Sequence, residues 1–293
     1  MGVDWIRETD VFPEGDPGDP DSLRALRPWV LEEKDGTLRM WYSGSDGETT
    51  QILEAVQHEG EPWERLGVNL RPGLAGDSDG YGVESPCVVR VPSGYLMAYG
   101  GFDGEMTRLH MATSPDGRQW ESQGTILQRG ADDIGGANHP CLVPTGERWW
   151  LFFTGYTRQG IATRGAILGA VSQTGASWDR VGPVLGPVGA ETTTSHPCVL
   201  DIEREFMMFY SADRGREVSI ALATSPDGVS WDRRGSVIHA SGEESDEVAV
   251  HTPCAVRLRD GSLRIWFAAL TAGDREAAYR IRSARFSADP HCS

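Results

Sequence analysis

Three histidines and one glutamate occur at matching places in a repeated motif of this sequence. The motif occurs at Glu84-Ser85-Pro86-Cys87, Asn138-His139-Pro140-Cys141, Ser195-His196-Pro197-Cys198 and His251-Thr252-Pro253-Cys254, with a looser copy at Leu26-Arg27-Pro28-Trp29. Three imidazoles and a carboxylate can ligate a divalent first-row metal such as Zn, Fe or Mn and leave positions for water or substrate. We therefore predict a site made of His139, His196, His251 and Glu84, holding a divalent metal and no organic cofactor.

Two other roles for these four residues stay open. They can transfer protons or bind substrate without a metal, or each histidine can simply hydrogen-bond a carbonyl or a neighbouring acid in the fold. The same motif contributes Arg27, whose fixed positive charge suits a carboxylate or phosphate. The alternative for Arg27 is an internal salt bridge to Glu84.

Further substrate-binding candidates surround these residues. Asn138 and Ser195 belong to the motif itself, and the loops that follow the aromatic segments contribute Phe102, Tyr156 and Asp213. The two aromatic side chains are suited to stacking on a sugar or another ring.

The spacing of the motif indicates how these residues are positioned. Successive motif prolines, at 28, 86, 140, 197 and 253, are 54 to 58 residues apart, which indicates one structural unit repeated five times. In each unit an apolar strand follows the proline, an aromatic-rich strand comes next, and two more strands are separated by Gly/Asp/Ser turns. Four antiparallel strands per unit are typical of a propeller blade.

The last unit lacks its fourth strand at the C-terminus, but the N-terminus supplies a candidate. Residues 4–12 match residues 230–238, which form the fourth strand of the preceding unit. We predict an all-β, five-bladed β-propeller that occupies residues 1–293 as a single domain. Residues near 3–12 should join the blade built from 251–286 and close the ring, which protects sheet edges.

The composition indicates which classes of partner the protein can bind. The 293 residues carry a formal net charge of −16, which argues against binding to nucleic acid or to an anionic membrane surface. No apolar run approaches the ~20 residues of a membrane helix, and the N-terminus does not resemble a signal peptide. We expect a cytoplasmic protein with a small-molecule substrate. Four of its five cysteines occupy one repeat position, and we expect them to be reduced and buried.

The chain resembles the five-bladed propeller glycoside hydrolases of families 43, 32, 62 and 68. The resemblance rests on blade number and length, on the X-Pro start of each inner strand, and on the Thr-Ser-Pro-Asp-Gly turns at 113–117 and 224–228. It implies catalytic carboxylates before the prolines of blades 1, 3 and 4. This sequence has Arg27, His139 and the pair Ser195-His196 there instead, so the usual pair of carboxylates is missing from the motif.

Three functions are consistent with the sequence. The first is an enzyme with a histidine-rich, metal-bearing axial site that acts on a small polar, anionic, sugar-like metabolite, of the hydrolase, lyase or cyclase type. The second is a glycoside hydrolase that uses Glu84 with displaced carboxylates. The third is a non-catalytic propeller that binds a glycan or metabolite. The displaced candidates are Asp21, Asp79, Asp133, Glu191 and Asp246, although their regular spacing before the prolines suggests a repeated structural loop contact.

Overall fold

A computed structural model describes residues 4–159, 162–215, 217–241, 247–271 and 278–287. These residues form strands β1 to β20 and one 3-10 turn, η1 (Ala131–Asp133), as expected for an all-β chain. Among them there is no helix of the length and apolar character needed to cross a membrane.

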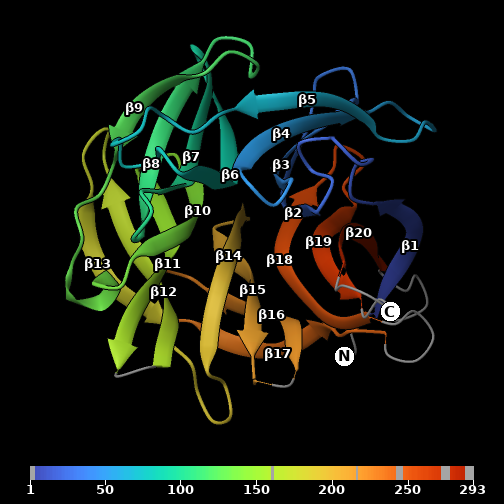
Figure 1. Cartoon of the computed structure of the whole chain (residues 1–293). Coiled ribbons are helices and arrows are strands. Elements are labelled where there is room, and N and C mark those ends of the chain that lie inside the picture. Colours follow the sequence, from blue (N-terminus) through green and yellow to red (C-terminus); the bar gives the residue numbers. More distant parts are fainter. Residues whose placement is uncertain (1–3, 160–161, 216, 242–246, 272–277, 288–293) are drawn as a thin grey trace.

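The strands form five antiparallel blades, which confirms the predicted architecture (Figure 1). Blade 1 consists of β2 (Arg24–Glu32), β3 (Leu38–Ser45), β4 (Thr50–Gln57) and β5 (Glu64–Leu70). Blade 2 consists of β6 (Gly82–Val91), β7 (Gly94–Phe102), β8 (Thr107–Ser114) and β9 (Glu121–Thr125). Blade 3 consists of β10 (Ala137–Pro144), β11 (Trp149–Gln159), β12 (Ala162–Ser172) and β13 (Asp179–Leu185). Blade 4 consists of β14 (Thr193–Ile202), β15 (Glu205–Asp213), β16 (Val218–Ser225) and β17 (Asp232–Ile238).

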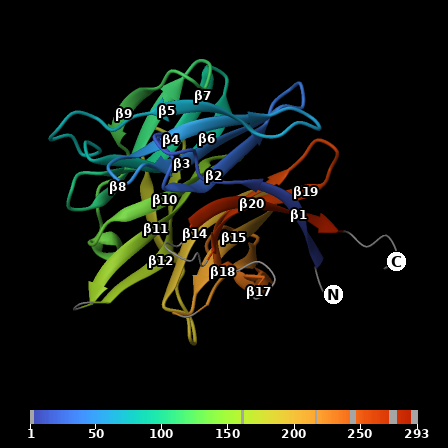
Figure 2. The ribbon, with the colours of Figure 1, turned by 45° about the vertical axis from the view of Figure 1, so that its right-hand side comes forward.

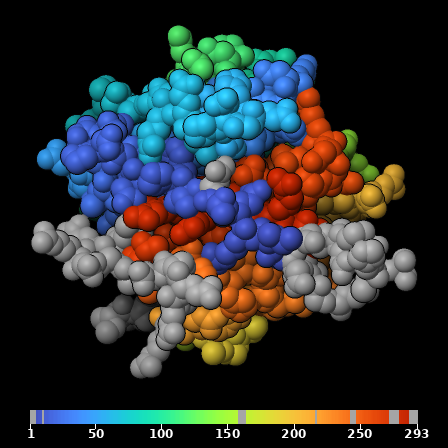
Figure 3. Space-filling view, turned by 90° about the vertical axis from the view of Figure 1, so that its right-hand side faces the viewer, coloured from blue at the N-terminus to red at the C-terminus, as the bar shows by residue number. Residues whose placement is uncertain are grey.

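Blade 5 is assembled from both ends of the chain, as predicted. It consists of β18 (Glu247–Arg257), β19 (Leu263–Thr271), β20 (Ala278–Ser287) and the N-terminal strand β1 (Asp4–Phe12). β1 pairs antiparallel with β20, with Trp5 opposite Phe286. The blue N-terminal strand lies beside the red C-terminal one in Figure 2, and Figure 3 shows the blue residues packed across the red ones.

The residue after each motif proline packs around the axis. In blade 1 this residue is Trp29, which contacts all five hydrophobic clusters of the core and donates a hydrogen bond from Nε1 to the Val88 carbonyl at 2.7 Å. In the other blades it is a cysteine, and all four cysteines are buried and free. Each cysteine Sγ accepts a backbone N–H from the next blade, as when Cys141 accepts from Val199 at 3.2 Å. The thiols therefore join neighbouring blades without disulfides.

Candidate functional site

The residue before each motif proline adopts a left-handed backbone conformation. The φ angles of these residues lie between 53° and 57°, and the residues are Arg27, Ser85, His139, His196 and Thr252. Each sits in a bulge of its inner strand, as where His139 and Pro140 together occupy the interval between the Asn138–Thr154 and Cys141–Phe152 pairs. Proline has no N–H for the ladder, so a bulge accommodates it. A positive φ in a non-glycine residue costs roughly 1–3 kcal/mol and persists only where surrounding contacts impose it.

Side chains of the preceding blade impose part of this conformation. The backbone N–H of Ser85 donates to Ser43 Oγ at 2.8 Å, that of His196 to Thr154 Oγ1 at 3.0 Å, and that of Thr252 to Ser211 Oγ at 3.0 Å. These three hydroxyls occupy equivalent positions on the second strands of blades 1, 3 and 4.

Blade 2 has Gly100 at that position, and blade 3 compensates with its own side chain. The His139 N–H donates to Asn138 Oδ1 at 2.8 Å. A Cβ at Gly100 would overlap this Asn138 oxygen, so only glycine leaves room for the amide. The pre-proline N–H thus again donates to a side-chain oxygen, but in blade 3 the acceptor is the amide of the preceding residue.

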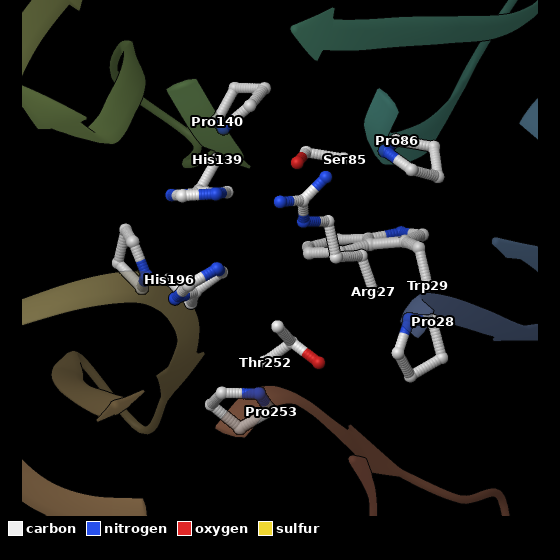
Figure 4. Close-up of a pocket in the computed structure, with 11 residues that line it drawn as sticks. Arg27, Pro28, Trp29, Ser85, Pro86, His139, Pro140, His196, Thr252 and Pro253 are labelled. Atoms are coloured by element: carbon white, nitrogen blue, oxygen red, sulfur yellow. The ribbon is translucent and has the colours of Figure 1, made fainter. Parts of the chain in front are cut away.

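The five pre-proline residues and their prolines line one axial cavity, with Trp29 beside them (Figure 4). The volume of the cavity is about 30 Å³. A water needs roughly 10–15 Å³ of such space, so the cavity accepts a group of one or two water-sized atoms. A carboxylate or one face of a phosphate fits this description, with the remainder of a ligand lying above it.

Arg27 and Glu84 form the charged side of the site. The Arg27 guanidinium makes an ion pair with Glu84, which confirms the internal salt bridge considered for Arg27. Asn138 Nδ2 donates to the other Glu84 carboxylate oxygen at 2.5 Å. Both oxygens of Glu84 are therefore occupied, and Figure 4 shows the guanidinium between Ser85 and His139.

His139 and His196 form the uncharged side of the site. Their ring centroids are 3.5 Å apart. Burial and the charge of Arg27 hold the pKa of His139 well below its ordinary value. Burial, the neighbouring His139 and Arg27 do the same to the pKa of His196. Both rings are neutral near pH 7 for that reason.

Three buried polar atoms around the cavity have no hydrogen-bond partner within the described part of the chain. They are Arg27 Nε, Ser85 Oγ and His139 Nε2, from blades 1, 2 and 3. Buried polar groups are nearly always satisfied, so a set of such atoms on one cavity marks a place where a polar ligand or water would bind. This set is the strongest chemical signal in the site.

The predicted site residues divide into two groups. The structure brings together Arg27, Glu84, Asn138, His139 and His196, and Ser195 Oγ bonds His196 Nδ1 at 2.8 Å. Tyr156 approaches His139 Nδ1 with its hydroxyl at 3.4 Å.

Three other predicted residues do not line the cavity. His251 lies two residues before its proline, so Thr252 lines the cavity in its place, and His251 stands behind His196 with ring centroids 6.0 Å apart. Burial and the Arg27 charge lower the pKa of His251 to about 4. Phe102 is exposed on the rim, and Asp213 caps its own turn by accepting the Gly215 N–H at 2.6 Å.

Sequence reasoning missed Ser85 and Thr154. Ser85 is marked by its position directly before Pro86, but the more reactive Glu84 beside it is the stronger candidate by residue type alone. Thr154 is fully buried on β11, where its hydroxyl meets His139 Nδ1 at 3.1 Å as well as the His196 N–H. No local motif marks it, because its role depends on two strands from different blades.

The predicted metal ligands do not fit a metal in this arrangement. Within the described residues, no group of three or more His, Cys, Asp or Glu side chains is placed to hold an ion. The reason is geometric. The rings of His139 and His196 lie against each other at an inclination of 31°, and the guanidinium of Arg27 binds one oxygen of Glu84. A cation at the centre would be repelled by that fixed positive charge.

The displaced carboxylates serve the blades instead of the axis. Asp21 pairs with Arg65, Asp133 with Arg180, and Glu191 with Arg233, in each case an arginine from the fourth strand of the same blade. In blade 2, where Ser122 replaces the arginine, Asp79 accepts a hydrogen bond from Tyr99 at 2.8 Å. In blade 5 the corresponding ion pair joins Glu247 to Arg7 of the fourth strand, β1. Asp246 lies outside the described residues. These acids form the repeated loop contact considered from the sequence.

Known proteins share the fold with this chain. No family model matches it. Two uncharacterized proteins of Mycobacterium tuberculosis, MT1551 of strain CDC 1551 / Oshkosh and Rv1502 of strain ATCC 25618 / H37Rv, are 26% and 25% identical to it. Both matches extend over 239 residues, which are 74% of this chain and 79% of each relative.

Solved structures of similar shape are glycoside hydrolases. One described as a glycoside hydrolase has a TM-score of 0.78 at 16% identity, over 95% of this chain and 92% of that one. A thermostable family-43 glycoside hydrolase has a TM-score of 0.77 at 15% identity, over 94% and 92%. A third has a TM-score of 0.71 at 13% identity, over 96% of this chain and 94% of that one. Its description states that the GH130 family of mannoside phosphorylases contains glycoside hydrolases that target β-1,2 mannosidic linkages in Candida mannan. The chain therefore has the five-bladed propeller fold of these glycoside hydrolases.

Proposed function

We propose that the axial cavity is the active site of an enzyme that acts on a small, anionic, sugar-like metabolite. The observation that carries this proposal is a set of three buried polar atoms on one cavity, Arg27 Nε, Ser85 Oγ and His139 Nε2, which have no partner among the described residues. They come from three consecutive blades, and hydrogen-bond donors from separate elements around one small cavity suit an oxygen-rich group.

We assign the proton of neutral His139 to Nε2, because the Thr154 hydroxyl is placed to donate to Nδ1. Thr154 Oγ1 accepts the backbone N–H of His196, so its own hydroxyl proton is free to go to His139 Nδ1, 3.1 Å away. A neutral imidazole with Nδ1 accepting must carry its proton on Nε2. His139 Nε2 is then a donor, as are Arg27 Nε and the Ser85 hydroxyl. Three donors directed at one small space favour a carboxylate, a phosphate or a developing oxyanion.

Glu84 is the carboxylate bonded to the residues of this site. It accepts one hydrogen bond at each oxygen, from Arg27 and Asn138, and each oxygen keeps a second lone pair. A carboxylate in this position can accept a proton from a bound substrate while the three donors stabilise the negative charge that develops. This arrangement suits a lyase, a cyclase or a hydrolase that forms an oxyanion, and we derive no step that needs a metal.

Hydrolysis of glycosides by two carboxylates is not supported by these contacts. That reaction uses a pair of acids about 5–9.5 Å apart across the bond that breaks. Of the described acids, Glu84 reaches the axis, while Asp21, Asp133 and Glu191 are held in ion pairs within their own blades. The similarity to glycoside hydrolases is thus a reason to test sugar-like acids, and not a reason to assign glycosidase activity.

Binding of simple anions tests the proposal. Acetate and inorganic phosphate should each perturb the histidine NMR signals of the wild-type protein. Ser85→Ala removes one donor without changing charge and should weaken binding by roughly 10- to 150-fold, because a hydrogen bond to a charged group contributes roughly 1.5–3 kcal/mol. Arg27→Ala should abolish binding, and the exposed Arg118→Ala provides the matched arginine control.

Two results would decide against the proposal. Unchanged anion binding in Arg27→Ala and Ser85→Ala would place the anion elsewhere. Stoichiometric metal in the purified protein, with binding lost on chelation, would show that the histidines rearrange around an ion. A non-catalytic role is favoured by the fact that both Glu84 oxygens already have partners, and binding of sugar acids without turnover by the wild type would establish it.

A further inference from the structure

Aromatic rings form a continuous arc along one side of the axial site. Tyr156 meets His139 edge to face with ring centroids 6.2 Å apart, and His139 and His196 form a tilted pair at 3.5 Å. His196 and His251 follow at 6.0 Å, and His251 meets Tyr279 edge to face at 5.4 Å. The arc therefore runs through blades 3, 4 and 5.

The other side of the site is charged. Arg27 and Glu84 stand on blades 1 and 2, with Asn138 bridging to blade 3. The imidazoles of the arc are uncharged near pH 7, so the arc is a polarisable, neutral wall. The site therefore has one face that suits an oxyanion and one that suits the apolar face of a ring.

We propose that the arc binds the ring of a sugar acid whose acid group lies at Arg27, Ser85 and His139. This inference rests on the proposed function and adds the substrate class. The axial cavity of about 30 Å³ is too small for a sugar ring, so the ring must lie above it, beside the partly exposed rings of the arc. C–H groups on a sugar face and aromatic rings attract each other, and such contacts also exclude water from the acid group.

Replacing Tyr279 tests this inference without testing the proposed function. It ends the arc on β20 and lies outside the set of residues that line the cavity. Its removal should therefore affect the ring of the ligand and spare the acid group. Arg24 lies over the Tyr279 ring at 5.9 Å, a contact that helps to position that side chain.

The experiment compares glucuronate with acetate by NMR titration. Wild-type protein should bind glucuronate more tightly than acetate, and the sugar protons should shift upfield in the complex because they lie over aromatic rings. Tyr279→Ala should reduce glucuronate affinity by about three- to tenfold, as expected from the size of ring–ring contacts, and leave acetate affinity unchanged. Tyr279→Leu removes the aromatic ring but leaves a smaller gap than alanine, and should give the same result if the alanine variant is unstable.

The matched control is Tyr95→Ala, which removes a half-buried tyrosine at the other end of β7 from the axial site. It should change neither affinity. If Tyr279→Ala and Tyr279→Leu keep the wild-type ratio of glucuronate to acetate affinity while Arg27→Ala loses both ligands, the arc proposal is wrong and the proposed function stands. If the wild type binds neither acid, both proposals fail.

Discussion

The imidazole rings of His139 and His196 lie with their centroids 3.5 Å apart and their planes inclined by 31°. One hydroxyl, that of Thr154, contacts both residues, through the ring of His139 and the backbone N–H of His196. Protonating either ring would place a buried positive charge beside the other imidazole and near the Arg27 guanidinium, which is unfavourable. The pair is therefore stable only while both rings are neutral.

This pair predicts a loss of stability in mildly acidic solution. The folded-state pKa values of His139 and His196 lie below the ordinary value of about 6.5, so between that value and the folded values the unfolded chain binds more protons. The free energy of unfolding should fall as pH drops from about 7 to about 5, by up to about 1.4 kcal/mol per pH unit for each histidine. Urea denaturation across this pH range measures the slope.

A variant without one ring isolates the contribution of the pair. His139→Gln should flatten the slope, whereas His58→Gln, which changes an exposed histidine, should leave it as in the wild type. An identical slope in wild type and His139→Gln would show that the histidines do not titrate as their burial requires.

A carboxylate paired within its blade, such as Asp133, should affect stability, whereas Glu84 at the axial site should affect ligand binding. Asp133→Asn should lower the free energy of unfolding by about 1–3 kcal/mol, because it weakens a buried partner of Arg180, and should leave acetate binding unchanged. Glu84→Gln should change the stability less and disturb ligand binding or turnover. Chemical denaturation and the NMR titration together measure both effects. Loss of ligand binding in Asp133→Asn with normal stability would restore the displaced carboxylates as candidates for catalysis.

Ring closure predicts a large effect of the N-terminal strand. Arg7 on β1 bonds the buried Glu247 at 2.5 Å, and Trp5 packs edge to face on Phe209 of blade 4. Deleting residues 1–12 removes these contacts, exposes the edge of β20, and should strongly destabilise or aggregate the protein. Arg7→Ala should cost about 1–3 kcal/mol by leaving a buried carboxylate with fewer donors. A truncated protein that melts like the full chain would contradict the closure.

The axial cysteines should be inert in the native protein. Cys87, Cys141, Cys198 and Cys254 are buried, and burial together with a neighbouring thiol raises the pKa values of Cys87 and Cys254. A thiol reagent should label them only as the protein unfolds, because the thiolate is the reactive form. Cys292 lies outside the described residues, so Cys292→Ser is the protein to label. Rapid native labelling of that variant would place the four thiols outside the core.

The sequence by itself determined the architecture. The period of the X-Pro motif, the alternation of strands and turns, and the match of residues 4–12 to residues 230–238 predicted five blades closed by β1, and the structure confirms this. Such features are local, so they can be read from one chain. The sequence also located Arg27, Glu84 and His139 at the axis, because a repeated motif must occupy equivalent places in every blade.

Only the tertiary structure decided what these residues form. Each motif bulge fixes φ near 55°, so the residue directly before the proline faces the cavity; Thr252 therefore displaces His251 from the lining. His139 and His196 lie against each other and do not converge on an ion. Their placement depends on the Thr154 hydroxyl of β11, which contacts both residues, and on the bond from Arg27 to Glu84. Those contacts join residues from different blades, and pair distances between blades are set by the packing of the whole ring, which no local spacing in the sequence encodes.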